Sequence, residues 1–93
     1  MRYEWDNHKK IANKIKHGVD FESASDFEWD SALEALDTRE TYGEERWIAI
    51  GLISKRLHVL IYTFRGNNIR LISLRKANDR EVTFYEENRQ INR

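Results

Sequence analysis

The chain has 93 residues, and its 16 basic side chains balance its 16 acidic ones, so the formal net charge is zero. That length predicts a single domain over 1–93 with one core, and the neutral balance argues against a non-specific nucleic-acid binder. Because the chain has no cysteine, disulfides and thiolate metal sites are excluded, and a reducing cytoplasm is the simplest setting. No apolar run approaches the roughly 20 residues of a membrane span, so no membrane contact is expected. The polar last few residues are expected to be disordered.

Charge is segregated along the chain. Residues 1–19 carry five Lys or Arg against two acids, residues 20–46 carry ten acids against two Arg, and residues 47–93 carry nine Lys or Arg against four acids. Such a pattern can build a basic groove on a neutral protein, with the acidic stretch elsewhere or facing a basic partner. The alternative is that folding mixes the two signs into an ordinary solvated surface.

The N-terminal residues predict a short strand followed by a helix. Residues 3–5 are typical of a strand, and Asp6 stands where an N-cap is needed for a helix over 7–17. Gly18 follows as the residue that ends the helix, since glycine readily adopts positive φ. His17 therefore lies at a helix C-terminus, where it is either a proton donor or phosphate contact, or simply a cation that ends the helix.

The next segment is acidic and less regular. Asp20 is expected to cap a second, shorter helix that runs to about residue 26. Phe27 and Trp29 alternate with charged residues and suggest a short strand. Residues 30–45 are expected to form a loop or a weak strand.

Three alternating apolar runs dominate the second half of the chain. They span 46–53, 56–64 and 69–75, and the short polar turns 54–55 and 66–67 separate them. This spacing predicts consecutive antiparallel strands. The predicted fold class is therefore α+β: a small antiparallel sheet, made of a three-strand meander and short N-terminal strands, with N-terminal helices and a C-terminal helix.

The two turns also predict the strand register and hence the faces of the sheet. Counting outward from the turns, Tyr62 lies opposite Leu71 and His58 lies opposite Arg75. One face is then apolar and is expected to be buried under helices. It holds Ile48, Ile50, Leu52, Leu57, Val59, Ile61, Ile72 and Leu74, with Arg46, Thr63 and Arg70 in a row at its end. The other face carries Trp47 together with Tyr62, His58 and Arg75, which suits a shallow surface that receives a ligand or a partner.

The last strand ends in a basic pair, Arg75 and Lys76. Asn78, with Glu81 three residues on, signals the start of a helix over 78–88. Backbone N–H groups and the helix dipole both favour an anion at such a place. Two solvated cations at the end of a surface strand would give the same pattern.

Cationic side chains are concentrated after residue 54. Between residues 55 and 80 the only acid is Asp79. The same range holds seven cations: Lys55, Arg56, Arg65, Arg70, Arg75, Lys76 and Arg80. With Trp47 and Tyr62 they suit phosphate binding and base stacking. The histidines show no metal-ligand spacing, so neither a metal site nor a cofactor is expected.

These residue types could cleave RNA without a metal. Attack by a 2′-hydroxyl needs a scissile phosphate held in line, neutralisation of its growing charge, and a modest proton shuttle. Arginine can supply the first two. His, Glu or Tyr can supply the third, and the spacing does not decide among them.

Seven motifs, in this order, resemble the BrnT family of toxins. They are Tyr3-Glu4-Trp5-Asp6, Lys16-His17-Gly18, Phe21-Glu22-Ser23-Ala24, Tyr42-Gly43-Glu44-Glu45-Arg46, Ile50-Gly51, Thr63-Phe64-Arg65-Gly66 and Ile69-Arg70-Leu71-Ile72-Ser73-Leu74-Arg75-Lys76-Ala77. Glu81 and Tyr85-Glu86 continue the match. The resemblance therefore spans almost the whole chain.

The resemblance implies a RelE-like fold and a ribonuclease toxin of a type II toxin–antitoxin module, which cuts RNA and blocks translation in the bacterial cytoplasm. It also implies a BrnA antitoxin with a ribbon-helix-helix part. The toxin itself would then contact DNA only through this antitoxin. The residues to which it assigns function are Arg75, Arg65 and His17 for catalysis, and Lys16, Arg46, Arg70 and Lys76 for RNA binding. Strand register and side-chain chemistry add His58, Trp47 and Tyr62 to the binding set.

A binding module without catalysis is the alternative. The surface around Trp47, Tyr62 and Ser73 would then hold a partner helix, and the acidic stretch 20–46 would attract a basic protein. The complex with a DNA-binding partner would regulate transcription. Phe84, an aromatic residue off the apolar side of the last helix, could dock on such a partner.

Overall fold

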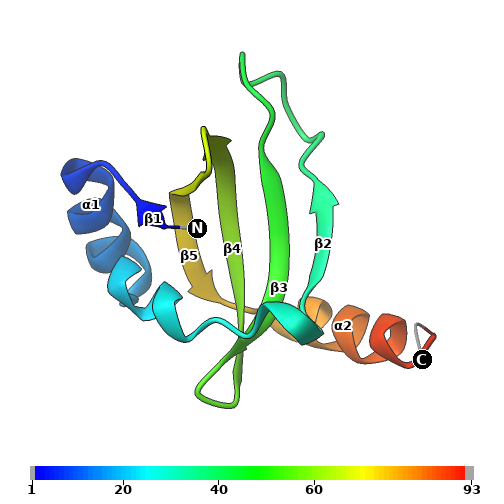
Figure 1. Cartoon of the computed structure of the whole chain (residues 1–93). Coiled ribbons are helices and arrows are strands. Elements are labelled where there is room, and N and C mark those ends of the chain that lie inside the picture. The colour runs from blue at the N-terminus through cyan, green and yellow to red at the C-terminus, as the bar shows by residue number, and fades with distance from the viewer. Residues whose placement is uncertain (1, 92–93) are drawn as a thin grey trace.

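A five-stranded sheet forms the centre of the fold (Figure 1). The computed structural model describes residues 2–91, and the predicted disorder of the last few residues lies outside the described residues. The strands lie in the order β1-β5-β4-β3-β2, with the bounds β1 Tyr3–Glu4, β2 Leu33–Leu36, β3 Trp47–Ile53, β4 Arg56–Arg65 and β5 Asn68–Lys76. Neighbours are antiparallel except for β1, which runs parallel to β5. The sheet is therefore mixed, and the prediction of an antiparallel sheet is wrong.

Two helices follow β1 and begin at the predicted caps. α1 spans Asn7–His17; the Asp6 side chain accepts a hydrogen bond of 2.9 Å from the first helical turn, and Gly18 ends the helix with φ of 73°. η1 spans Phe21–Asp26, and the Asp20 side chain caps it in the same way, at 2.9 Å. Both predicted helices are confirmed, the second as a 3₁₀ helix.

Asn13 joins α1 to the sheet. Its buried amide donates to the carbonyl oxygens of Val19 at 3.0 Å and Leu74 at 2.7 Å, and its Oδ1 accepts from the Leu74 N–H at 3.1 Å. β1 pairs with β5 only at Ile69 and Arg70. Further along β5, Asn13 therefore satisfies the backbone groups that a neighbouring strand would otherwise bind.

The predicted strand at 27–29 is wrong, because the chain enters a 3₁₀ helix there, η2, over Trp29–Ser31. The Phe27 ring packs on Gly51, where a Cβ would lie 2.6 Å from the Phe27 Cζ, so this position requires glycine. The Trp29 indole N–H donates to the Tyr3 hydroxyl at 2.6 Å. Packing of these two rings against the sheet, rather than strand alternation, sets the path of the segment.

A β-bulge in β5 changes the predicted register of the last two strands. Tyr62 pairs with Leu71, as predicted. Ile61 then pairs with Ser73, which leaves Ile72 as an extra residue. Beyond the bulge, each side chain of β5 is moved to the other face of the sheet.

The bulge moves the end of β5 relative to the prediction. Arg75 pairs with Val59, and Lys76 takes the predicted place of Arg75 opposite His58. Leu74 becomes fully buried on the face opposite to the predicted one. The prediction that His58 and Arg75 share a face is therefore wrong.

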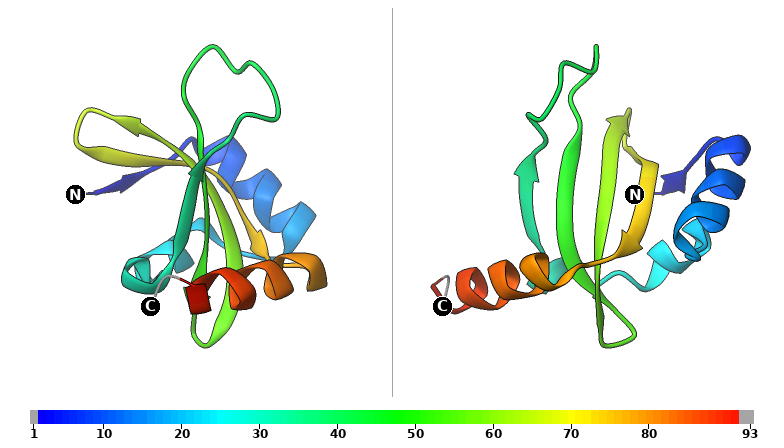
Figure 2. Two further views of the ribbon diagram at one scale, coloured as in Figure 1. Left: turned by 90° about the vertical axis from the view of Figure 1, so that its right-hand side faces the viewer. Right: turned by 180° about the vertical axis from the view of Figure 1, so that it is seen from behind.

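The sheet buries apolar residues on both faces, and the η1–η2 segment and α2 lie on its opposite sides (Figure 2). The face that we call the η1 face packs against the η1–η2 segment, and its buried residues include Ala49, Leu60, Tyr62, Leu71 and Leu74. The opposite face, which we call the α2 face, packs against α2 and includes Ile50, Val59 and Ile61. The η1 face was expected to be an open surface, and this expectation is wrong. It provides most of the fully buried side chains.

The last helix, α2, spans Asp79–Ile91 and covers the lower part of the α2 face (Figure 2). Its predicted start is confirmed: the Asn78 N–H donates to Glu81 Oε1, and the Glu81 N–H donates to Asn78 Oδ1, both at 2.9 Å. The Tyr85 hydroxyl donates to the Ser31 carbonyl at 2.9 Å, which ties α2 to the segment before β2. No helix in the described part of the chain is both long and apolar enough to cross a membrane.

Candidate functional site

Four of the predicted site arginines project from the α2 face of the sheet: Arg46, Arg65, Arg70 and Arg75. Strand register and the alternation of side chains place them there, with Arg70 and Arg75 on β5, Arg65 at the end of β4 and Arg46 just ahead of β3. The upper part of this face carries no helix (Figure 2). The four guanidinium groups therefore lie on one face of the sheet, and each of them is paired with a carboxylate of the protein.

Arg75 makes a two-pronged ion pair with Glu81 at the N-terminus of α2. Its Nη1 and Nη2 each lie 2.8 Å from a carboxylate oxygen of Glu81. This hydrogen-bonded pair raises the pKa of Arg75 and lowers the pKa of Glu81, in both cases against the effect of burial. The place where the sequence predicts a bound anion is thus filled by the protein's own carboxylate.

His17 and Lys16 lie at the C-terminus of α1, and His17 is close enough to Arg75 for the charge of Arg75 to act on it. Together with Ser73 they line a hollow of about 200 Å³ between α1 and β5. The pKa of His17 is lowered, first by burial and then by the charges of Lys16 and Arg75. This direction favours a neutral imidazole at physiological pH, and a neutral imidazole can accept a proton.

Arg39, which the sequence did not single out, lies near enough to the pair of Arg75 and Glu81 for its charge to act on both residues. The β2–β3 loop is organised around Asp37, whose side chain is 1% exposed and receives two hydrogen bonds of 2.7 Å from Arg39. These bonds lower the pKa of Asp37 to about 2. After the bond between Arg75 and Glu81 itself, the nearby charge of Arg39 is among the causes that act on the pKa of both residues.

Arg46 is held by the same loop. Its Nε lies 3.3 Å from the Glu44 carboxylate, and its guanidinium carbon lies 4.2 Å from the centre of the Tyr42 ring. The Tyr42 hydroxyl donates to Asp37 at 3.2 Å, so the loop positions Arg39 and Arg46 together. These are the two basic residues of the acidic segment, and that isolation is the sequence signal that could have identified Arg39.

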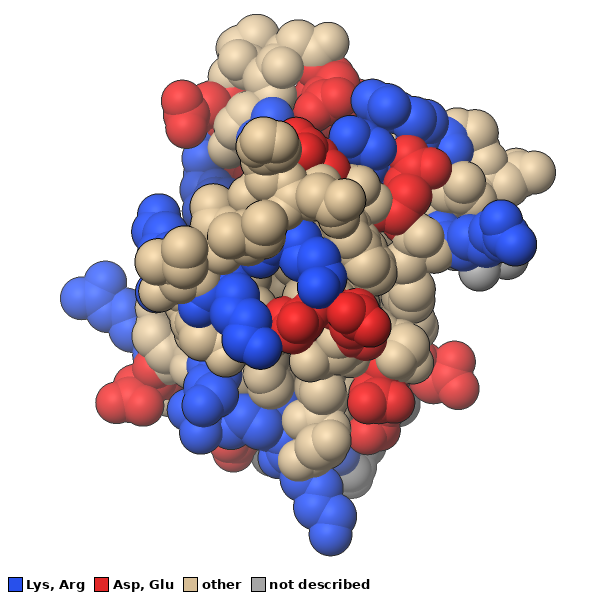
Figure 3. All heavy atoms as spheres, turned by 90° about the vertical axis from the view of Figure 1, so that its left-hand side faces the viewer, with Lys and Arg blue, Asp and Glu red and all other residues tan. Residues whose placement is uncertain are grey.

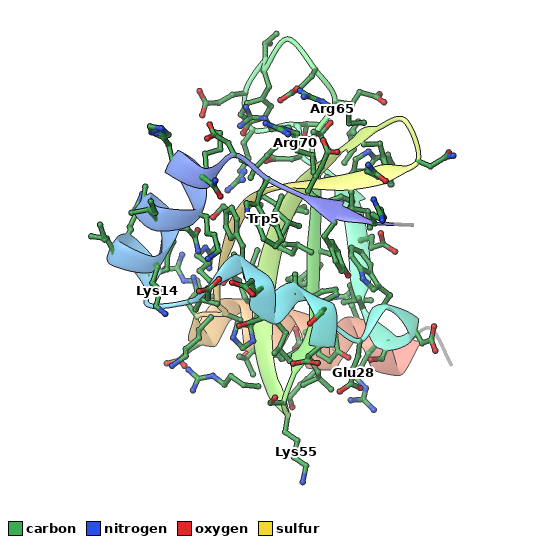
Figure 4. All side chains as sticks on the ribbon, turned by 60° about the vertical axis from the view of Figure 1, so that its left-hand side comes forward. Trp5, Lys14, Glu28, Lys55, Arg65 and Arg70 are labelled. Atoms are coloured by element: carbon green, nitrogen blue, oxygen red, sulfur yellow. The ribbon has the colours of Figure 1, made fainter. Side chains whose placement is uncertain are left out.

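Arg65 and Arg70 converge on Glu4 at the far end of β5. Arg70 Nη1 lies 3.2 Å and Arg65 Nε lies 3.8 Å from Glu4 Oε1, and the Asn68 amide donates to Glu4 Oε2 at 3.0 Å. Figure 4 shows the two arginines close together near β1. This second cationic cluster is separated from Arg75 by most of the length of the strand.

His58 and Lys76 lie on the η1 face, away from Arg75. His58 is 6% exposed, and its Nδ1 lies 2.8 Å from the Arg56 carbonyl oxygen. Burial is the largest cause of its lowered pKa. The bulge thus moves Arg75 to the α2 face, and His58 stays on the η1 face, where it is buried away from the cationic site.

Trp47 and Tyr62 also belong to the η1 face. Tyr62 is 1% exposed, and its hydroxyl donates to the Glu34 carboxylate. Its ring meets the rings of Trp29 and Phe64 edge-on, with centroids 5.3 and 5.7 Å away. Burial, followed by the bond to Glu34, raises the pKa of Tyr62. In this structure the two predicted stacking residues pack within the protein.

Basic side chains gather over the side of the molecule formed by α1, β1 and β5, with acidic groups among them (Figure 3). Lys10, for example, lies 3.4 Å from Asp20 and 3.1 Å from Glu22. Lys55 projects separately from the β3–β4 turn at the opposite end (Figure 4). The arrangement provides several points at which the phosphates of a polyanion could bind. Within residues 2–91, no three His, Asp or Glu side chains are grouped so as to hold a metal ion.

Residues 5–81 match a known protein family. The matching family model is described as the ribonuclease toxin, BrnT, of a type II toxin–antitoxin system. The matched range begins at Trp5 and ends at Glu81, so it includes both His17 and Arg75. A search of curated proteins finds no match.

Proposed function

The chain belongs to the family of BrnT ribonuclease toxins of type II toxin–antitoxin systems, and on that premise we propose that it is an endoribonuclease that cleaves RNA without a metal ion and so inhibits translation in the cytoplasm. The observation that carries the proposal is the position of Arg75. Its guanidinium is held on the α2 face by Glu81, and its charge, like that of Lys16, acts on the imidazole of His17. These are the groups that attack by a 2′-hydroxyl requires.

Arg75 is assigned to the scissile phosphate. Its two terminal nitrogens hold the two oxygens of the Glu81 carboxylate at 2.8 Å. A phosphate presents a similar pair of acceptor oxygens, so RNA can take the place of Glu81 without a change in the shape of the donor. In the transition state the guanidinium then neutralises the charge that grows on the phosphate oxygens.

His17 is assigned as the group that accepts the 2′-hydroxyl proton. Burial and the charges of Lys16 and Arg75 lower its pKa, which favours the neutral form that this role needs. Lys16, one residue away, supplies a further positive charge for the RNA backbone.

The remaining exposed arginines of the α2 face are assigned to RNA binding. Arg65 and Arg70 share Glu4 at the other end of β5, seven or fewer strand positions from Arg75. A strand rises about 3.3 Å per residue, so Arg65 contacts a different phosphate from the one that Arg75 holds. We therefore place Arg65 with Arg70 and Arg46 as a binding residue rather than a catalytic one.

The family implies an antitoxin partner, and we propose that it is of the BrnA type, with a ribbon-helix-helix part through which the complex contacts DNA. The ten acids of residues 20–46 support a basic partner surface. A RelE-like architecture also remains our prediction. Its support is the α+β arrangement with a cationic sheet face.

Growth of bacteria that express the chain tests the proposed function. The parent is expected to arrest growth, and Arg75→Ala is expected to relieve the arrest. Arg80→Ala is the matched control, since Arg80 is an exposed arginine in the first turn of α2, and it should remain toxic. An Arg75→Ala variant as toxic as the parent would contradict the assignment. Purified parent that leaves RNA intact, yet binds a small basic protein, would favour a non-catalytic binding module.

A further inference from the structure

A groove lies between β2 and α2, at the opposite edge of the sheet from Arg75. Its volume is about 590 Å³. Its wall is mainly apolar, with Leu33, Ile48 and Ile50 from the sheet and Phe84 from α2. Phe84 is 53% exposed, which is unusual for a phenylalanine that has an apolar groove beside it. We call this feature the β2 groove.

The edge of the sheet beside the β2 groove is open. β2 is the last strand in the sheet and pairs only with β3. The Asp37 N–H donates to the Arg46 carbonyl at 2.7 Å, so alternate residues of β2 bond inward to β3. The backbone groups of Glu34 and Leu36 therefore point outward, where no strand within residues 2–91 pairs with them. Such an edge is a template for an added strand.

The same edge is negatively charged. Glu34 is the one charged residue among the described residues that line the β2 groove, and its carboxylate lies at the same edge on the η1 side, where it accepts from the Tyr62 hydroxyl. Asp30, Glu40 and Glu44 are exposed in the segments that precede and follow β2. A second copy of this chain would bring an equally acidic edge against the first, and like charges opposite each other oppose pairing. A segment with Lys or Arg residues is complementary to the edge.

We propose that an extended, basic segment of the protein antitoxin adds a strand to the outer edge of β2 and places an apolar side chain against Phe84 in the β2 groove. This inference rests on the proposed function, because it names the docking surface for the antitoxin that the family implies. β2 and β5 are three strand spacings apart in the sheet, which is roughly 14 Å. Docking at β2 and cleavage at Arg75 therefore depend on different residues.

Two variants test the docking surface. Phe84→Glu removes the apolar anchor and adds an acid at an exposed position. Leu36→Pro removes an outward-facing N–H without removing a hydrogen bond to β3, which an edge strand tolerates. Each is expected to weaken binding of the antitoxin, produced from the adjacent gene of the same operon, by about tenfold or more. Ribonuclease activity and the melting temperature of each variant should remain close to those of the parent.

Ile15→Glu is the matched control for Phe84→Glu. Ile15 lies on α1, distant from the β2 groove, and is 82% exposed, so the same substitution is made on another exposed apolar residue. This control should bind the antitoxin as the parent does.

Four outcomes separate the possibilities. Parental affinity in both Phe84→Glu and Leu36→Pro would overturn the docking surface, and so would loss of binding in Ile15→Glu alone. A chain that dimerises by itself, and is monomeric as Phe84→Glu, would show a second copy in the groove and would also overturn it. A parent that binds antitoxin through the groove but cleaves no RNA would instead refute the proposed activity and leave the docking surface standing.

Discussion

Single residues whose chemistry depends on one partner explain much of the candidate site. Asp37 is the clearest case, because its buried carboxylate is satisfied by Arg39 and Tyr42 and gives the β2–β3 loop its shape. Arg75 is the second case, since Glu81 fixes the guanidinium and is itself fixed by Asn78. In both cases a carboxylate within the protein holds an arginine in a defined position. The guanidinium group of that arginine is therefore positioned before any substrate binds.

Replacement of Asp37 by Asn should destabilise the protein by about 1 kcal/mol at neutral pH, because Arg39 loses its charged partner. The pKa of Asp37 is lowered from 3.8 to about 2 in the folded protein, foremost by the Arg39 side chain. The stabilisation is therefore fully present above pH 3.8 and is lost as the pH falls through 2. Urea denaturation of parent and variant between pH 7 and pH 2 should show a difference that shrinks with acidification. A difference that is independent of pH would contradict this.

His17 should titrate below the ordinary histidine pKa of 6.5, because burial and then Lys16 and Arg75 disfavour its charged form. Protonation therefore favours the unfolded chain, so this residue lowers stability as the pH falls below 6.5. Arg75→Gln removes one of the two nearby cations and should raise the pKa of His17. NMR titration of the imidazole protons measures this. An unchanged pKa in Arg75→Gln would show that the two side chains do not interact.

At the scale of elements, the short-range signals of the sequence were reliable. The helix starts at Asp6 and Asn78 and the strand pairs joined by two-residue turns were predictable, because caps and turns depend on residues close together in the chain. The bulge at Ile72 was not predictable, because an extra apolar residue looks like any other in an alternating run. The bulge made Lys76 rather than Arg75 the partner of His58, and it moved Arg75 to the other face of the sheet.

The direction of β1 and the route of residues 27–31 were also beyond the sequence. β1 has two residues, and nothing in Tyr3 or Glu4 indicates whether the strand runs parallel or antiparallel to β5. Phe27 and Trp29 follow the shape of the sheet beneath them, which depends on Gly51 far along the chain. The sequence singled out Arg46, Arg65, Arg70 and Arg75. It did not single out Arg39, because only the fold brings Arg39 near the pair of Arg75 and Glu81.

Replacement of Asn13 should show how strongly α1 depends on the edge of β5. Asn13→Ala removes three hydrogen bonds and leaves the Leu74 N–H and carbonyl without their partner. The expected loss of stability is about 2–4 kcal/mol, measured by urea or thermal denaturation. Asn7→Ala, at an exposed position of the same helix, is the control and should change little. A loss of stability no greater than that of the control would mean that water satisfies the backbone groups of Leu74 as well as Asn13 does.

At the scale of the whole molecule, the net charge of zero does not describe how charge is distributed over the surface. Cations project from the α2 face, and on the side formed by α1, β1 and β5 they are interspersed with acidic groups (Figure 3). Asp30, Glu34 and Glu40 are exposed on and around β2. RNA and a basic partner can therefore bind the same small protein at different places. In the proposed mechanism the two ends of β5 bind different phosphates of the RNA, one at Arg75 and the other at Arg65 and Arg70.

Arg65→Ala should weaken RNA binding without a comparable loss in the rate of the chemical step. One phosphate contact fewer lowers the slope of log affinity against log salt by about 0.7 for a single strand. Binding of a labelled RNA measured over a range of salt concentrations gives this slope. If Arg65→Ala instead lowers kcat as far as Arg75→Ala does, Arg65 acts in catalysis and our assignment is wrong.

Cleavage of a defined RNA by the purified protein in excess EDTA tests the central claim most directly. The parent should cleave with EDTA present, Arg75→Ala should lose about 10²–10³-fold in kcat, and Arg80→Ala should keep the parental rate. Loss of cleavage by the parent protein in EDTA, or an Arg75→Ala variant that cleaves at the parental rate, would contradict the account.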